Sequence, residues 1–171
     1  MVVFQNERAG MNYKIRLIKE NEIEEAAKVY ATAFNEAQVG ENWTDETAFD
    51  FLNFWYKKAK DLFFVAEKNK KIIGGVVGEI IPYAEGKYFS NGELFVDPTF
   101  QNQGVAKELN KKVISEAINK FGVKYLCWEA DYKAQFPIAW YESIGMKKTR
   151  WVLMDGEAKK VLENLNKKEE K

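Results

Sequence analysis

The sequence contains no histidine and a single cysteine, Cys127, among its 171 residues. Histidine is the side chain best suited to proton transfer near neutral pH and the commonest metal ligand, so carboxylates, tyrosines, lysines or water must carry any acid–base chemistry. One cysteine forms neither an intramolecular disulfide nor a thiolate metal cluster, which is typical of a reducing compartment. We therefore expect a cytoplasmic protein.

An excess of charge of one sign and a long apolar run are also lacking. Basic and acidic residues number 26 each, so the formal net charge is zero. A balanced charge removes the electrostatic attraction on which nucleic-acid binding usually depends. The longest apolar stretch, residues 72–78, is far shorter than the roughly 20 residues that cross a bilayer. We therefore expect that the chain binds neither nucleic acid nor a membrane.

Proline and glycine are too scarce for a fibrous or low-complexity chain, whereas the 46% of hydrophobic residues suffice for a packed core. The length is that of one domain, and no repeat or linker divides it. Met11 precedes a strand-like segment and is a second possible start, so we expect residues 1–10 to be a loose leader. Residues 11–155 are expected to form a single domain, and residues 156–171 a charged tail or short helix.

Hydrophobic periodicity predicts an α/β domain. Strands are expected over residues 12–19, 62–67, 72–83, 88–96, 124–130 and 147–154, with a hairpin at the polar stretch 68–71. Helices are expected over residues 21–34, 44–60, 103–121 and 136–143. Asn21 and Thr44 are the predicted N-caps of the first two helices.

The residues with the clearest chemistry open the helix expected over residues 103–121. From Leu94 the chain reads LFVDPTFQNQGVAKEL, which is a strand, a proline stop and a helix start. The first N–H groups of a helix lack intrahelical partners and form a cradle for phosphate. Small residues at Gly104 and Ala106 leave room for a diphosphate to approach these amides. Taken alone, the same residues are also compatible with an ordinary helix start.

This stretch resembles the pyrophosphate loop of the GNAT superfamily of acetyl-CoA-dependent N-acetyltransferases. That loop reads Gln/Arg-x-x-Gly-x-Gly/Ala after a strand that ends in Val-x-Pro, which matches Gln101–Ala106 and Val96–Pro98. A second family feature is a tyrosine shortly before Gly-Phe, and Tyr141 precedes Gly145 in a similar way, with Met146 in place of the aromatic residue.

The order of the expected elements is similar to that family over most of the chain. The resemblance implies a GNAT-like α/β fold, with a mixed central sheet of about six to seven strands flanked by about four helices. It also implies acetyl-CoA as co-substrate, an amine acceptor that attacks the acetyl carbon directly, and no metal.

In the family, the strand backbone pairs with pantetheine and the loop amides hold the pyrophosphate. The cofactor-binding residues that this implies are Leu94, Phe95, Val96, Gln101, Asn102, Gln103, Gly104, Val105, Ala106 and Lys107. Many relatives carry a further cofactor-contacting asparagine at the position of Ala134, and Gln135 is the candidate to replace it.

The resemblance also implies two catalytic residues. Tyr141 is the candidate acid that protonates the departing thiolate, and Glu129 matches a glutamate that serves as base in relatives. Glu93, on the cofactor-binding strand, and a water chain are alternatives for the base. A space-filling tyrosine and a solvated strand-end carboxylate are the structural alternatives for Tyr141 and Glu129.

The acceptor is expected at residues 34–60, which form one wall of the acceptor site in the family. The acidic and aromatic candidates there are Glu36, Glu41, Trp43, Asp45, Glu46, Asp50 and Phe54. They favour a small cationic amine through charge and cation–π attraction. A protein N-terminus or lysine is an alternative acceptor, and a non-catalytic acyl-CoA-binding sensor or interaction module is an alternative of another class. Phe54 is also a candidate contact of a homodimer.

Overall fold

The computed structural model describes residues 13–37, 40–131 and 135–169. It falls into two compact units, residues 1–129 and residues 130–171. The first unit contains β1 (Lys14–Leu17), η1 (Glu20–Glu22), α1 (Ile23–Ala37), α2 (Asp45–Ala59), η2 (Lys60–Leu62), β2 (Phe64–Lys68), β3 (Lys71–Tyr83), β4 (Gly86–Val96), η3 (Pro98–Phe100), α3 (Val105–Phe121) and β5 (Val123–Cys127). The second unit contains α4 (Gln135–Ser143) and α5 (Ala158–Glu169). The expected leader and Ala134 lie outside the described residues.

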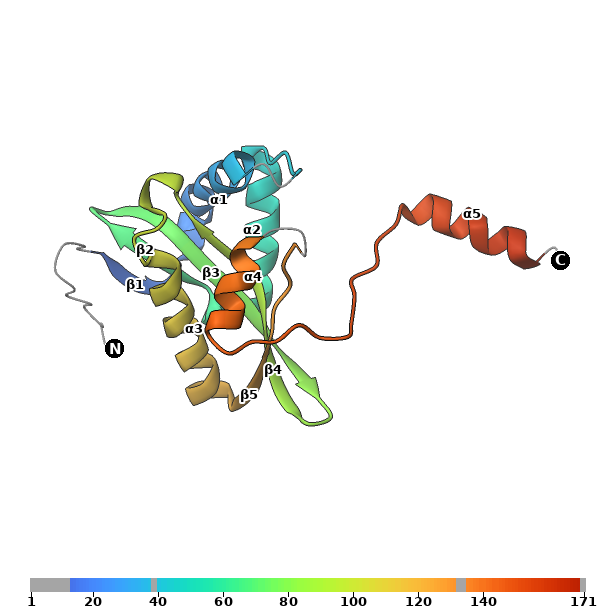
Figure 1. Ribbon diagram of the computed structural model, residues 1–171. Coiled ribbons are helices and arrows are strands. Elements are labelled where there is room, and N and C mark those ends of the chain that lie inside the picture. Colours follow the sequence, from blue (N-terminus) through green and yellow to red (C-terminus); the bar gives the residue numbers. More distant parts are fainter. Residues whose placement is uncertain (1–12, 38–39, 132–134, 170–171) are drawn as a thin grey trace. The chain divides into compact units, whose positions relative to one another are not determined.

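The first unit is built on a five-stranded sheet with the order β1-β2-β3-β4-β5 (Figure 1). The first four strands are antiparallel neighbours, and β5 joins β4 in parallel. A parallel neighbour needs a crossover, and α3 supplies it. The sheet is therefore mixed, as expected.

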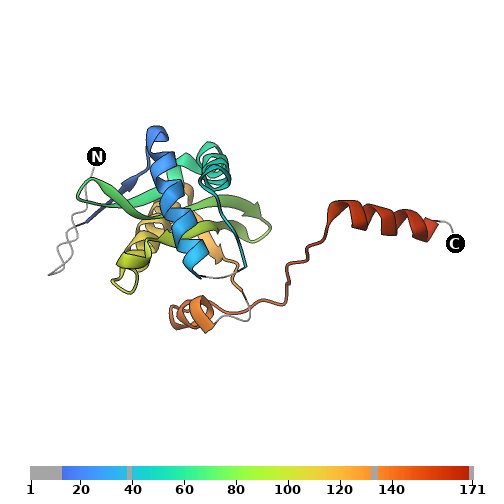
Figure 2. The ribbon, with the colours of Figure 1, turned by 90° about the horizontal axis from the view of Figure 1, so that it is seen from above.

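The two faces of the sheet carry separate cores, because successive strand residues point to opposite faces. Phe95 and Val77 pack with α1 and α2, whereas the adjacent Val96 and Val76 pack with α3. Helices thus cover both faces, α1 and α2 on one and α3 on the other (Figure 2). This arrangement confirms the predicted α/β fold class, with helices on both faces of a mixed sheet. Within the described ranges, every helix falls short of the length and apolar character that a bilayer span requires.

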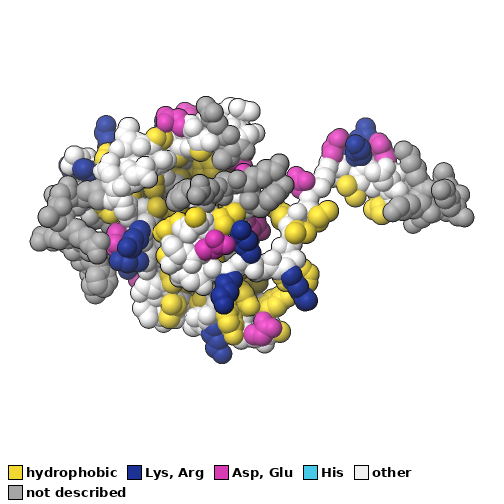
Figure 3. All heavy atoms as spheres, viewed as in Figure 1, with side chains coloured by type: hydrophobic (Ala, Val, Ile, Leu, Met, Phe, Trp, Pro, Cys, Tyr) yellow, Lys and Arg dark blue, Asp and Glu magenta, His cyan; other side chains and the backbone are white. Residues whose placement is uncertain are grey.

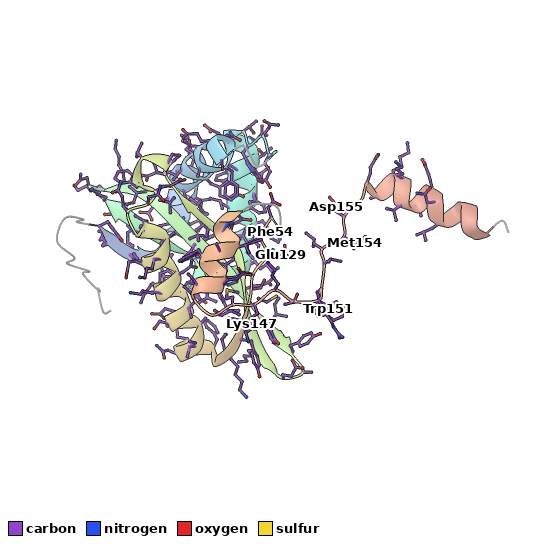
Figure 4. The ribbon with its side chains drawn as sticks, in the orientation of Figure 1. Phe54, Glu129, Lys147, Trp151, Met154 and Asp155 are labelled. Carbon is purple, nitrogen blue, oxygen red and sulfur yellow. The ribbon has the colours of Figure 1, made fainter. Side chains whose placement is uncertain are left out.

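Two sequence-based expectations differ from the structure. Residues 147–154 form no strand, so the described part of the sheet has five strands rather than six or seven. The reason is that a strand needs a ladder partner, and none of the described strands pairs with this segment, whose residues Trp151 to Met154 are 73–83% exposed (Figure 4). Asn21 lies inside the turn η1 rather than at the N-cap of α1. The described residues form five α-helices, and the last of them, α5, lies within residues 156–171, where a charged tail or short helix was expected.

Candidate functional site

The candidate site begins where strand β4 continues past the end of its parallel neighbour. β4 pairs with β5 from Lys87 to Ser90, whereas its pairing with β3 continues to Val96. On that side, no strand of the described residues pairs with Leu94–Val96, the segment expected to bind pantetheine. Backbone groups on an unpaired edge are available to an extended ligand. We call Leu94–Val96 the open edge.

A β-bulge interrupts β4 just before the open edge. The pairing with β3 shifts by one residue next to Val77, which leaves Gly92 as an extra residue. A Cβ atom on Gly92 would lie 2.6 Å from the Trp55 ring of α2, so the indole packs directly on the strand backbone. Glu93 faces the same side of the sheet, because the Tyr30 hydroxyl of α1 hydrogen-bonds to its carboxylate.

Glu93 has the electrostatic properties of a proton acceptor. Burial raises the pKa of its carboxyl to about 7, against an opposing contribution from the Tyr30 hydroxyl, which donates to Oε2 at 3.2 Å. The negative charges of Glu41 and Glu129 raise this pKa further. A carboxyl with a pKa near the working pH is well matched to general acid–base catalysis. Sequence reasoning offered Glu93 only as an alternative, because its burial and its tyrosine partner depend on the tertiary structure.

Glu129, the base implied by the resemblance, lies in the segment that follows β5 and is exposed (Figure 4). Its charge acts on Glu93. The structure therefore brings the two candidate bases within electrostatic reach of each other, near the point where the pairing of β4 and β5 stops.

Tyr141, the candidate acid, lies in α4 of the second unit. The Met146 N–H donates to the Tyr141 carbonyl at 3.1 Å, and Gly145 adopts φ 98° between them. This is a helix C-terminus closed by a left-handed glycine, so the Tyr-to-Gly spacing seen in the sequence has a local structural cause. The ring centroids of Tyr141 and Trp140 lie 5.4 Å apart.

The turn before α3 has an unusual backbone and no side-chain cap. Asn102 and Gly104 have positive φ values of 59° and 84°. Gly104 is the N-cap of α3, and no side chain of the described residues caps this helix there. The first N–H groups of α3 therefore have no capping side chain in front of them. A Cβ atom on Gly104 would meet nothing within 4 Å, so glycine is favoured by its backbone conformation rather than by crowding.

Side chains around this turn hold its shape. The Asp97 carboxylate accepts from the Thr99 N–H at 2.9 Å and from its hydroxyl at 2.6 Å. Gln101 Nε2 donates to the Val96 carbonyl at 3.1 Å, and Gln103 Nε2 donates to the Thr99 carbonyl at 2.9 Å. Both glutamines of the motif thus tie the turn to the residues before it. Sequence reasoning assigned them to the cofactor and did not predict this bracing role.

The residues expected at the acceptor wall separate into two groups. Trp43 packs on Tyr30 with ring centroids 5.1 Å apart, and its indole N–H donates to Glu41 Oε2 at 2.6 Å. Phe54 is 53% exposed on α2, and the Lys58 ammonium lies 5.5 Å from its ring centroid. Trp43 and Glu41 therefore lie in the same cluster as Tyr30 and Glu93. Phe54 lies apart from it, and its ring is already contacted by the Lys58 ammonium. On the face in Figure 3, basic and acidic side chains are interspersed.

A family model described as the acetyltransferase (GNAT) family matches residues 22–146. A search of the curated proteins gave no significant match. Among solved structures, the chain is similar to a possible acetyltransferase from Clostridium difficile 630, with TM-score 0.72 and 13% identity over 85% of this chain and 97% of that one.

Two further solved structures resemble the chain. One is a predicted acetyltransferase with acetyl-CoA from Clostridium acetobutylicum, with TM-score 0.66 and 16% identity over 84% of this chain and 96% of that one. The other is the aminoglycoside N-acetyltransferase AAC(6′)-Iy in complex with CoA, with TM-score 0.65 and 19% identity over 89% of this chain and 98% of that one. At these identities, the similarity establishes the shared fold.

Proposed function

This chain belongs to the acetyltransferase (GNAT) family, and we propose that it transfers an acetyl group from acetyl-CoA to a primary amine by direct attack. The observation that carries the proposal is the open edge, which leads through a short turn into the uncapped N-terminus of α3. An acyl-CoA needs two such features, a strand-like partner for pantetheine and a cluster of amides for the diphosphate. Similar structures that hold acetyl-CoA or CoA support the same cofactor.

We assign the cofactor to the residues that the sequence motif indicated. The open edge would pair with pantetheine and help to polarise the thioester carbonyl. The amides from Asn102 to Lys107 would hold the diphosphate, with Gly104 at their centre. The exposed Lys107 would add one positive charge.

The reaction requires control of protons. An amine with a pKa of roughly 10.4 arrives mostly as ammonium and must lose a proton before it attacks the acetyl carbon. The C–N bond then forms as the C–S bond breaks, and the thiolate that leaves takes up a proton. We assign the first transfer to Glu93 and the second to Tyr141. Glu93 is favoured over Glu129 because it is partly buried, hydrogen-bonded and has a pKa raised to about 7.

We propose a small cationic amine as the acceptor. Glu41 lies close enough to act electrostatically on both Glu93 and Tyr30, and the Trp43 indole holds its carboxylate. A cation that approaches Glu93 would therefore be attracted by a second carboxylate and by an aromatic face. The similarity to an aminoglycoside N-acetyltransferase agrees with this class. A protein N-terminus or lysine is the second acceptor class to test.

The test is thiol release from acetyl-CoA with a panel of cationic, neutral and anionic amines. Glu93→Gln should lower kcat by about 100-fold or more, since general base catalysis commonly contributes that much. Tyr141→Phe should lower it as well. Glu24→Gln, which alters an exposed glutamate of α1 paired with Lys28, is the control and should leave the rate unchanged.

Three results would contradict parts of this assignment. Equal rates with cationic and anionic acceptors would exclude the cationic class. A larger loss in Glu129→Gln than in Glu93→Gln would move the base to Glu129. Tight binding of acetyl-CoA with no thiol release from any acceptor would favour a sensor or interaction module instead.

A further inference from the structure

Tyr30 carries a hydroxyl group into the core between α1, α2 and the sheet. Its side chain is 1% exposed, and its hydroxyl donates to Glu93 Oε2 at 3.2 Å. A buried hydroxyl without a partner costs free energy, and phenylalanine would fill the same space without that cost. The hydroxyl therefore needs an explanation beyond packing, and its contact is with the proposed base.

Aromatic neighbours fix the position of the Tyr30 ring. The centroids of Phe34, Trp43, Phe95 and Phe51 lie 4.4, 5.1, 5.4 and 5.7 Å from that of Tyr30. Such a shell holds the hydroxyl at one place above the bulge of β4.

The loop that supplies Trp43 is itself fixed to α1. The Asn35 side chain bonds to both the N–H and the carbonyl of Trp43, each at 2.8 Å. The aromatic shell is thus anchored at both ends, by the helix and by the sheet.

We propose that Tyr30 is a positioning residue, whose hydroxyl holds the Glu93 carboxylate at the bulge of β4 so that it can receive the proton of the acceptor amine. The inference rests on the proposed function, because Glu93 must be the base. Burial and the nearby charges of Glu93 and Glu41 raise the pKa of Tyr30 above its ordinary value, so its hydroxyl remains a donor throughout the working pH range.

The charged and polar groups around Glu93 determine the direction in which each substitution should shift its pKa. A hydroxyl donor stabilises the ionised carboxylate more than the protonated carboxyl group, so Tyr30 lowers the pKa of Glu93. Glu41, from the loop after α1, and Glu129, from the segment after β5, raise it by repulsion. Removing the Tyr30 hydroxyl should therefore raise the pKa of Glu93, and removing the charge of Glu41 should lower it.

The experiment is the pH profile of kcat/KM for a cationic amine in the full chain. Tyr30→Phe keeps the ring and should move the acid limb upward by about one pH unit, since a hydrogen bond to a charged group is worth about that much. The rate should recover at high pH, where Glu93 is ionised in both proteins. Glu41→Gln should move the acid limb to lower pH. Tyr56→Phe, which removes the hydroxyl of a partly buried tyrosine that packs against the same core, is the matched control and should not move it.

Carboxyl-carbon NMR titration of Glu93 provides a readout that does not require activity. Its pKa should rise in Tyr30→Phe and fall in Glu41→Gln, with thermal unfolding used to confirm that each variant is folded. An unchanged titration, or an equal loss of rate at every pH, would overturn the positioning role. A wild-type chain without thiol release would overturn the proposed function, whereas the NMR shift would still report the contact of Tyr30 with Glu93.

Discussion

The N-termini of α2 and α3 use the same unsatisfied amides differently. At α2, Thr44 Oγ1 accepts from the Thr47 N–H at 3.1 Å, and Thr47 Oγ1 accepts from the Thr44 N–H at 3.0 Å. At α3, Gly104 occupies the N-cap with φ 84° and provides no side chain. Both helices begin with N–H groups that lack intrahelical acceptors. The start of α2 satisfies part of these amides from within the chain and gains stability, whereas the start of α3 leaves them uncapped, for the diphosphate in the function proposed above.

The two ends of α3 sharpen the contrast. Gly122 closes the C-terminus with φ 68°, and its N–H bonds to the carbonyls of Ala117 and Ile118. Gly104 and Gly122 share the left-handed conformation, and a Cβ atom on either would meet nothing within 4 Å. The two glycines thus have similar steric requirements and differ in which helix end they occupy.

The largest expected effect is on acetyl-CoA binding in Gly104→Glu. A carboxylate at the amide cradle would repel the diphosphate and occupy the amides, so the Kd should rise by about 100-fold, equivalent to about 2.7 kcal/mol. Gly122→Glu is the matched control, because it introduces the same strain at the opposite helix end. Its Kd should stay within about twofold of wild type.

Calorimetric titration of each variant with acetyl-CoA provides the measurement. Both substitutions should lower the free energy of unfolding by about 1–2 kcal/mol, since both force a side chain into a left-handed backbone. If the two variants lost affinity equally, the loss would come from destabilisation and the cradle would be wrong.

Local sequence signals predicted the starts of α2 and α3, including the turn at Gly104. Gly104 and the helix after it were predicted from the motif and the apolar row of residues 103–121, and Thr44 was predicted as a cap from its residue type alone. Each depends on contacts within a few residues, which a sequence pattern contains. The hairpin at residues 68–71 was predicted for the same reason and is confirmed.

The open edge of β4 and the contact between Tyr30 and Glu93 depend on long-range pairing, which local patterns do not contain. The strands over residues 88–96 and 124–130 were predicted, but the end of their pairing at Ser90 was not. Tyr30 and Glu93 are 63 positions apart, so no local pattern could join them. The same limit explains the error at residues 147–154, which have the composition of a strand and no pairing partner among the described strands.

The second prediction concerns the capped helix. Thr44→Ala removes the acceptor for the Thr47 N–H and should lower the free energy of unfolding by about 1 kcal/mol. Urea denaturation measures this change, and the Kd for acetyl-CoA should remain that of the wild type. Thr32→Ala is the control, because its hydroxyl bonds to the Lys28 carbonyl inside α1 and caps nothing. A loss of cofactor affinity in Thr44→Ala would show that the two helix starts are not independent.

The smallest effect is expected from the one charged side chain in the cradle. Lys107 lies in the first turn of α3 and is exposed, so solvent and salt screen its attraction for a diphosphate. Lys107→Gln should raise the Kd by about two- to fivefold at low salt, and the difference should shrink at high salt. Lys111→Gln, one turn later and paired with Glu108 at 3.1 Å, should change the Kd less. If Lys107→Gln weakened binding as strongly as Gly104→Glu, the side chain rather than the backbone would carry the affinity, and the contrast between an uncapped and a capped helix start would lose its functional meaning.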